Sequence, residues 1–162
     1  MLYSIPGRCG VEIAVDTVVR LASACPSVVA LKEAGGSCDR ISQLRAVLPS
    51  RFNLLSGDDS LTLPFMSVGA VGVVSVASNV APRQVSTLVQ KFLKGDARGA
   101  ARLHAKLYPL FRNLFVETNP TPVKAALAEM GMMTDEVRLP LVPVNESSRA
   151  IVRETLKSLG LL

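Results

Sequence analysis

The first part of the chain alternates short apolar runs with longer amphipathic segments. The apolar runs predict strands over Met1–Ile5, Val28–Leu31, Phe52–Leu55 and Gly72–Val76. Helical spacing of apolar residues predicts helices over residues 11–23, from Ser37 or Asp39 to about Val47, over 60–67, and from Pro82 to about Lys94. Strands that alternate with helices at such short intervals along the chain predict right-handed crossovers and a parallel α/β sheet.

The pattern changes from Asp96 onward and becomes helical. Helices are predicted over Ala97–Phe115, Pro122–Met130 and Glu146–Leu159, with an extended linker over Val137–Val144. The sequence therefore predicts four βα units in residues 1–95 and a helical C-terminal region in 96–162. A closed barrel of this kind needs eight parallel strands and about 250 residues, so the βα units predict an open sheet, a self-associating half or part of something larger.

Lys32 lies directly after the apolar run Val28–Leu31. This run is too short for a helix and does not alternate, which predicts a parallel strand buried on both faces. Lys32 would then lie at the carboxyl edge of the sheet, where α/β proteins bind ligands. An ammonium held there loses hydration, and the neutral amine could attack a carbonyl and form a Schiff base. The alternative is a lysine that extends from a strand end into solvent.

Composition narrows the classes of function. Hydrophobic residues make up 49% and charged residues 19%, which indicates a folded globule. The net charge of +5 comes from scattered basic residues and Trp is absent, which argues against a nucleic-acid partner. The chain has three cysteines without CxxC spacing, Cys9, Cys25 and Cys38, and a single histidine, His104, so we expect no zinc site. Three thiols with no obvious pairing also suggest that the protein is located in the reducing cytoplasm. With no secretory signal and no transmembrane-length apolar run, we expect a soluble protein without a membrane partner.

Several short motifs carry a family resemblance. They are Tyr3–Gly10, Ala30–Ala34, Leu55–Asp59, Gly72–Val76, Phe115–Lys124 and Val137–Pro140. With these motifs the chain resembles the dihydrodipicolinate synthase family of pyruvate-dependent class I aldolases, to which N-acetylneuraminate lyase is related. The resemblance runs from Met1 to Leu162. It implies the C-terminal half of a (βα)8 TIM barrel, units five to eight, followed by a helical extension, in a truncated chain that lacks the first half-barrel.

The resemblance also implies roles for five residues. Lys32 matches the lysine that forms the Schiff base with pyruvate, and Tyr3 matches a tyrosine that relays protons. Arg8 matches the arginine that binds the carboxylate of aspartate semialdehyde, and an arginine fork suits a carboxylate chemically. Gly57 and Val74 match positions that line the pyruvate pocket. The covalent Schiff base implies no metal and no separate cofactor.

Other interpretations remain open. Tyr3 could fill the core, and Arg8 could be a solvated loop residue. The family implies a lyase that condenses pyruvate with aspartate semialdehyde in lysine biosynthesis, and Arg8 favours this branch over N-acetylneuraminate lyase and the keto-sugar acid aldolases. A threonine and a second tyrosine of the family's proton relay would lie in the absent half. The chain could therefore be a catalytically incomplete fragment that needs a separate N-terminal half-barrel, or it could form a homo-oligomer. A further alternative is an open-sheet module that only binds a carboxylate.

Overall fold

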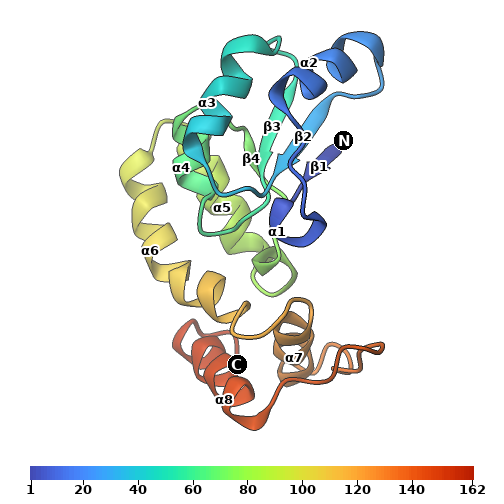
Figure 1. Cartoon of the computed structure of the whole chain (residues 1–162). Coiled ribbons are helices and arrows are strands. Elements are labelled where there is room, and N and C mark those ends of the chain that lie inside the picture. The colour runs from blue at the N-terminus through green and yellow to red at the C-terminus, as the bar shows by residue number, and fades with distance from the viewer. The chain divides into compact units, whose positions relative to one another are not determined.

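A computed structural model describes residues 1–162, which form two compact units, Met1–Ser75 and Val76–Leu162. Figure 1 shows the elements of each unit. The first unit contains the whole sheet, and the second is helical. The division expected from the sequence, 1–95 and 96–162, separates the βα units from the helical region and stays a prediction.

The first unit is built on a four-stranded parallel sheet with strand order β1-β2-β3-β4. The strands are β1 Leu2–Ser4, β2 Ala30–Glu33, β3 Asn53–Ser56 and β4 Gly72–Val73. The helices of this unit are α1 Pro6–Cys9, α2 Val15–Ala24, α3 Cys38–Val47 and α4 Thr62–Ser67. Sequential strands are neighbours and every connection passes through a helix, which confirms the predicted α/β class.

The two faces of this sheet differ in burial. Leu31 and Leu54, which are register partners, are fully buried on the face where the side chains of Ser4 and Glu33 also lie. Tyr3, on the other face, is 45% exposed. Successive side chains of a strand point to opposite faces, so β2 places Leu31 and Glu33 on one side and Lys32 on the other. Burial on both faces, predicted for Val28–Leu31, is found at Ala30 and Leu31 but not at Val29, which is exposed. Lys32, which follows this run, is half-buried.

Several predicted boundaries were wrong by a few residues. The strand expected over Val28–Leu31 forms over Ala30–Glu33, because Val28 closes a turn by donating its N–H to the Cys25 carbonyl at 2.9 Å. The helix expected from residue 11 starts only at Val15, and a short helix at Pro6–Cys9 was not predicted. The strand expected over Gly72–Val76 ends at Val73. The helix predicted from Ser37 is confirmed, and the Ser37 hydroxyl caps it by accepting a hydrogen bond from the N–H of Arg40 at 3.2 Å.

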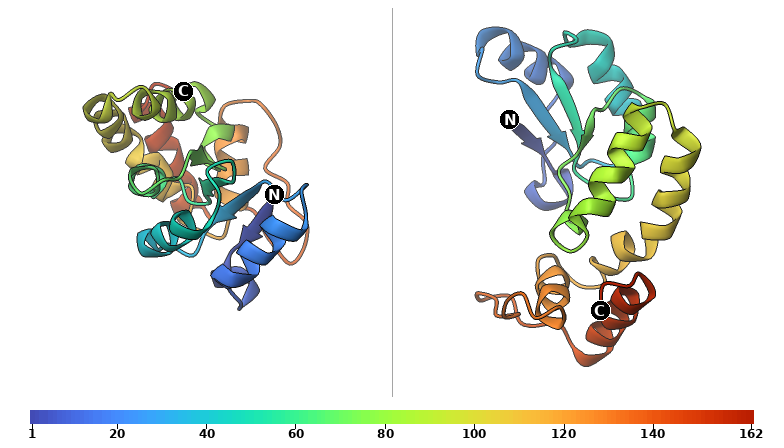
Figure 2. Two further views of the ribbon diagram at one scale, coloured as in Figure 1. Left: turned by 90° about the horizontal axis from the view of Figure 1, so that it is seen from above. Right: turned by 180° about the vertical axis from the view of Figure 1, so that it is seen from behind.

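The second unit contains a short 3-10 helix and four α-helices. They are η1 Ala77–Asn79, α5 Pro82–Leu93, α6 Ala97–Asn113, α7 Thr121–Glu129 and α8 Glu146–Ser158. Figures 1 and 2 show α5 and α6 as adjacent helices joined by a short loop, and α7 beside α8. Its core includes Leu88, Leu107, Leu110 and Leu156, each 0–1% exposed. Residues 137–144 contain no helix or strand, in agreement with the predicted linker.

No helix of the chain is both long enough and apolar enough to cross a bilayer. Cys9, Cys25 and Cys38 are all free thiols. No group of three or more His, Cys, Asp or Glu side chains is arranged to hold a metal ion.

Candidate active site at the carboxyl end of the sheet

Lys32 and Tyr3 lie side by side on the same face of the sheet. They are register partners on the parallel strands β2 and β1. The Lys32 Nζ atom lies 4.0 Å from the centroid of the Tyr3 ring, within the range of a cation–π contact. With Tyr3 45% exposed, its ring does not fill the core of this unit. The arrangement therefore presents an amine and a phenol together at a partly open surface.

Lys32 is close to the carboxyl end of its strand, as the sequence predicted. Only Glu33 follows it in β2 before the chain turns at Gly35 and Gly36. The same edge holds the ends of β1 and β3, because the parallel strands run in the same direction. This is the edge at which open α/β sheets bind their ligands.

Gly57 allows the loop after β3 to approach the end of β2. Its N–H donates to the Glu33 carbonyl at 2.7 Å. A Cβ atom added at Gly57 would lie 2.6 Å from the Cβ atom of Ala34 and 3.1 Å from the Glu33 carbonyl oxygen. A side chain at this position would therefore push against the segment just after Lys32. The predicted pocket-lining role of Gly57 stays a prediction, but its need for close backbone approach is evident in these contacts.

Val74 and Arg8 occupy the flanks of this edge. Val74 is half-buried just after β4, and its N–H donates to the Ser56 carbonyl at 2.8 Å. Arg8 lies on α1, the short helix that follows β1, and it is exposed. The fold thus places Tyr3, Lys32 and Gly57 at the carboxyl ends of β1, β2 and β3. Val74 lies at the carboxyl end of the next strand, β4. The predicted contact of Arg8 with a substrate carboxylate stays a prediction.

A buried ion pair beneath this edge was not anticipated from the sequence. Glu33 is fully buried, and its Oε2 atom accepts a hydrogen bond from Arg40 Nε on α3 at 2.8 Å. The sequence did contain one indication of this pair, because Glu33 is a charged residue that directly follows Lys32 at the end of an apolar run. Arg40 also falls on the apolar side of α3, next to Ile41 and four residues before Leu44, both fully buried.

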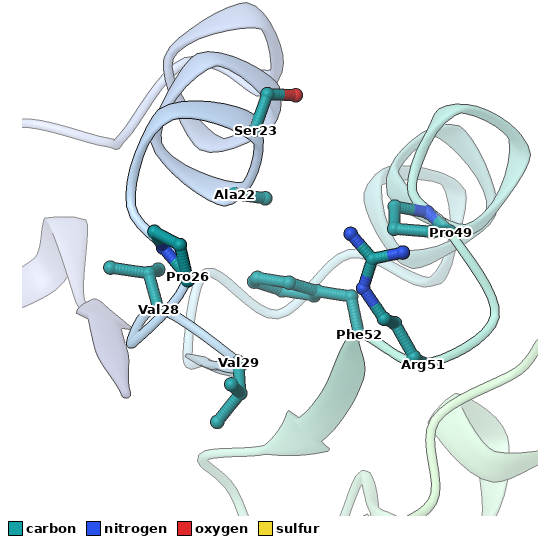
Figure 3. Close-up of a pocket in the computed structure, with 8 residues that line it drawn as sticks. All are labelled: Ala22, Ser23, Pro26, Val28, Val29, Pro49, Arg51 and Phe52. Carbon is teal, nitrogen blue, oxygen red and sulfur yellow. The ribbon is translucent and has the colours of Figure 1, made fainter.

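A small cavity lies at the opposite end of the same sheet. It has a volume of about 150 Å³ and is lined by residues that precede β2 and β3, including Val28, Val29 and Phe52 (Figure 3). The Arg51 guanidinium and the Phe52 ring extend toward its interior. Because parallel sheets bind ligands at their carboxyl edge, this cavity at the amino edge is not the predicted pyruvate site.

Comparison with known proteins decides the family. The model of the dihydrodipicolinate synthetase family matches residues 1–159. The chain belongs to the dihydrodipicolinate synthetase family. It is 48% identical over 162 residues to the 4-hydroxy-tetrahydrodipicolinate synthase of Thermosynechococcus vestitus, a match that covers 100% of this chain and 54% of that protein. The family resemblance noted in the sequence is thereby confirmed.

Solved structures of dihydrodipicolinate synthetase family members share this fold. The 4-hydroxy-tetrahydrodipicolinate synthase of Methylacidiphilum fumariolicum SolV superposes with a TM-score of 0.96 at 57% identity, covering 99% of this chain and 53% of that one. A chloride-inhibited dihydrodipicolinate synthase from Acinetobacter baumannii, solved in complex with pyruvate, gives a TM-score of 0.94 at 40% identity and covers 99% of this chain and 55% of that one. The chain spans about half the length of the curated relatives it matches.

Proposed function

We propose that this chain carries the Schiff-base-forming part of a lyase of the 4-hydroxy-tetrahydrodipicolinate synthase type. The reaction would condense pyruvate with aspartate semialdehyde in lysine biosynthesis. The observation that carries the proposal is the Lys32 amine, 4.0 Å from the Tyr3 ring centroid at the carboxyl edge of a parallel sheet. It is supported by family membership and by the relatives' names. The free thiols of Cys9, Cys25 and Cys38 suit a reducing cytoplasm, where we place the reaction.

Lys32 would act as the nucleophile. Its neutral amine attacks the keto carbon of pyruvate to form a carbinolamine. An acid then protonates the carbinolamine hydroxyl, which leaves as water, and the nitrogen lone pair forms the protonated imine. The imine withdraws electrons, so the methyl carbon of pyruvate loses a proton and an enamine forms. The enamine carbon then attacks the aldehyde carbon of the second substrate, and water releases the product and restores the amine. Lysine supplies the covalent catalysis, and no metal or separate cofactor takes part.

Tyr3 and Arg8 would serve proton transfer and substrate binding. The Tyr3 phenol is on the side chain whose ring contacts Lys32, and it would pass protons during carbinolamine dehydration. The Arg8 guanidinium on α1 would bind the carboxylate of aspartate semialdehyde through two parallel hydrogen bonds. Gly57 and Val74 would line the pyruvate pocket from the ends of the next two strands.

We place the chain as βα units five to eight of a (βα)8 barrel, the C-terminal half, followed by the helical extension. Support comes from the four parallel strands in sequential order and from the match to about half of each relative. Lys32 on the second strand here would then match the family's lysine on the sixth. A barrel closes only with eight strands, so the site would be completed by further βα units.

The outer strands favour a second candidate, a subunit that is catalytically incomplete by itself. Within the sheet, β1 pairs only with β2, and β4 pairs only with β3, so each leaves one side of its backbone without a strand partner. A complementing N-terminal half-barrel or a second copy of the chain would pair with these edges. N-acetylneuraminate lyase and keto-sugar acid aldolase activities remain alternative substrate choices for the same lysine.

Turnover with a complementing polypeptide tests the proposal. The chain should be assayed alone and after co-expression with a polypeptide that supplies the first four βα units of a relative. We expect condensation of pyruvate with aspartate semialdehyde in the complemented protein, and its loss in a Lys32→Arg variant that keeps the charge. Activity that survives Lys32→Arg would contradict the role of Lys32. Full activity of a monodisperse, monomeric chain would contradict the incomplete-subunit candidate.

A further inference from the structure

The buried pair formed by Glu33 and Arg40 lies on the opposite face of β2 from Lys32. Glu33 is 0% exposed and the Arg40 side chain 7% exposed. Arg40 Nε donates to Glu33 Oε2 at 2.8 Å. Both charges are removed from water, so each depends on the other for compensation.

The second carboxylate oxygen of Glu33 holds the turn after β2. Its Oε1 atom accepts a hydrogen bond from the Gly35 N–H at 2.7 Å. A Cβ atom added at Gly35 would lie 2.7 Å from this oxygen and 2.9 Å from an oxygen of Glu12, so two carboxylates lie against one side of the turn. The Glu33 side chain therefore fixes the path of the chain immediately after Lys32.

The remaining donors of Arg40 reach a different part of the chain. Arg40 Nη1 lies 3.2 Å from Glu12 Oε2, and Arg40 Nη2 donates a hydrogen bond to the Ile13 carbonyl. These two residues lie in the segment 11–14, which has no helix or strand and joins α1 to α2. The hydrogen bond from the Ile13 N–H to Ser4 Oγ, at 3.4 Å, is a longer link between this segment and the sheet. Arg40 is thus the main polar anchor of the segment.

This segment is continuous with the helix that carries Arg8. Helix α1 ends at Cys9, and Gly10 follows with φ +70°, where the backbone reverses into segment 11–14. At the start of α1, the Pro6 Cγ atom would lie 3.6 Å from a Cβ atom placed on Gly35. The guanidinium of Arg40 consequently connects the end of the Lys32 strand with the segment that follows the Arg8 helix.

We propose that Arg40, held by Glu33, is a positioning residue that fixes the helix carrying Arg8 relative to Lys32. The inference rests on the proposed function, in which Lys32 binds pyruvate and Arg8 binds the aldehyde's carboxylate. Loss of the Arg40 fork should then weaken the use of the second substrate more than the formation of the pyruvate adduct. A pair that served stability alone would affect both steps equally, or neither.

Arg40→Lys tests this role, and Arg45→Lys on the same helix is its matched control. Arg45 donates to the Phe52 carbonyl at 2.9 Å and to the Leu48 carbonyl at 2.7 Å, near the other end of α3. Both variants replace a fork that binds several acceptors by a single ammonium. Only Arg40→Lys touches segment 11–14.

The first measurement is amide hydrogen exchange across residues 6–14, which needs no substrate. Arg40→Lys should accelerate exchange there, and Arg45→Lys should not. The second measurement compares the Michaelis constant for aspartate semialdehyde with the yield of borohydride-trapped pyruvate adduct, in the protein form that turns over. We expect Arg40→Lys to raise the Michaelis constant roughly tenfold or more with the adduct yield within about twofold of wild type.

Unchanged exchange over residues 6–14 in Arg40→Lys would overturn the proposal, and so would an equal rise of the Michaelis constant in both variants. Absence of a pyruvate adduct in the wild-type protein would instead contradict the proposed function. The exchange measurement would still decide whether Arg40 holds the segment. A Glu33→Gln variant, which keeps the shape and removes the charge, should reproduce the effect of Arg40→Lys.

Discussion

The Nζ atom of Lys32 lies 4.0 Å from the centroid of the Tyr3 ring, and the two residues are register partners on adjacent parallel strands. The ring face orients the ammonium, because the quadrupole of an aromatic ring attracts a cation. The same side chain carries a phenol that can donate or accept a proton. One neighbour thus contacts the lysine and carries a group that is chemically capable of proton transfer.

Tyr3→Phe separates these two contributions. The phenylalanine ring keeps the contact with Lys32 and removes the hydroxyl, so protons must pass through solvent during imine formation. We expect the rate of pyruvate adduct formation, measured by borohydride quenching at successive times, to fall by about 10²-fold. The free energy of unfolding should change little, since Tyr3 is 45% exposed. A Tyr3→Phe variant as fast as wild type would exclude the phenol from proton transfer.

Gly57→Ala should destabilise the first unit. The added Cβ atom would meet Ala34 Cβ at 2.6 Å and the Glu33 carbonyl oxygen at 3.1 Å, which forces the ends of β2 and β3 apart. We expect a loss of about 1–3 kcal/mol in the free energy of unfolding, measured by urea denaturation. Gly7→Ala is the matched control, because a Cβ atom at Gly7 meets nothing within 4 Å. Equal stability of the two variants would show that the sheet edge tolerates a side chain at Gly57.

His104 makes the stability of the chain sensitive to acid. Burial holds the pKa of His104 below its usual value of 6.5, and its Nδ1 atom is buried without a hydrogen-bond partner. The unfolded chain therefore binds a proton on this residue at higher pH than the folded chain does. Stability should fall as the pH drops through 6.5 toward the lower folded-state pKa.

The measurement for His104 is the free energy of unfolding from about pH 7.5 to about pH 5.5, in wild type and His104→Gln. The variant should lose the part of the pH dependence that histidine supplies, because His104 is the only histidine in the chain. Parallel curves for the two proteins would contradict the assignment.

Glu129 makes the stability of the folded chain depend on pH in a lower range than His104 does. Hydrogen bonds from Arg153, at 2.7 Å, and from Arg149, at 2.9 Å, hold the pKa of Glu129 below its usual value of 4.5 and join α7 to α8. A carboxylate with a lowered pKa stabilises the folded state above its unfolded value and loses that contribution as the pH falls. Thermal unfolding at decreasing pH below 4.5 should therefore show a smaller loss of melting temperature in Glu129→Gln than in wild type. An identical loss in both proteins would contradict a stabilising role for this carboxylate.

The parts of the fold that depend on short-range patterns could be predicted from the sequence. Apolar runs located the strands to within a few residues, and Pro82 correctly marked the start of α5. Segment 11–14 was misassigned to a helix because Val11 and Ala14 continue the apolar spacing of α2. In the structure Arg40 binds this segment through the Ile13 carbonyl, a contact between residues far apart in sequence. Periodicity contains no information about such a contact.

The reactive residues of the candidate site could be predicted from the sequence, but the buried ion pair beneath them could not. Lys32 was singled out by its position after an apolar run, and the motif match added Tyr3. Glu33 stood out in the sequence as a charged residue at the end of an apolar strand, but its partner Arg40 could be identified only from the fold. A buried charge depends on a partner from another element, and that partner becomes visible only when the fold is known.

Our main proposal is that Lys32 binds pyruvate covalently. The most direct measurement treats the folded protein with pyruvate and borohydride, in the chain alone and in the complemented form, and maps the reduced adduct by peptide mass spectrometry. We predict one pyruvate-derived adduct on Lys32, absent from Lys32→Arg. An adduct on Lys124 or Lys157 instead, or none on Lys32 in a folded and complemented protein, would contradict this role.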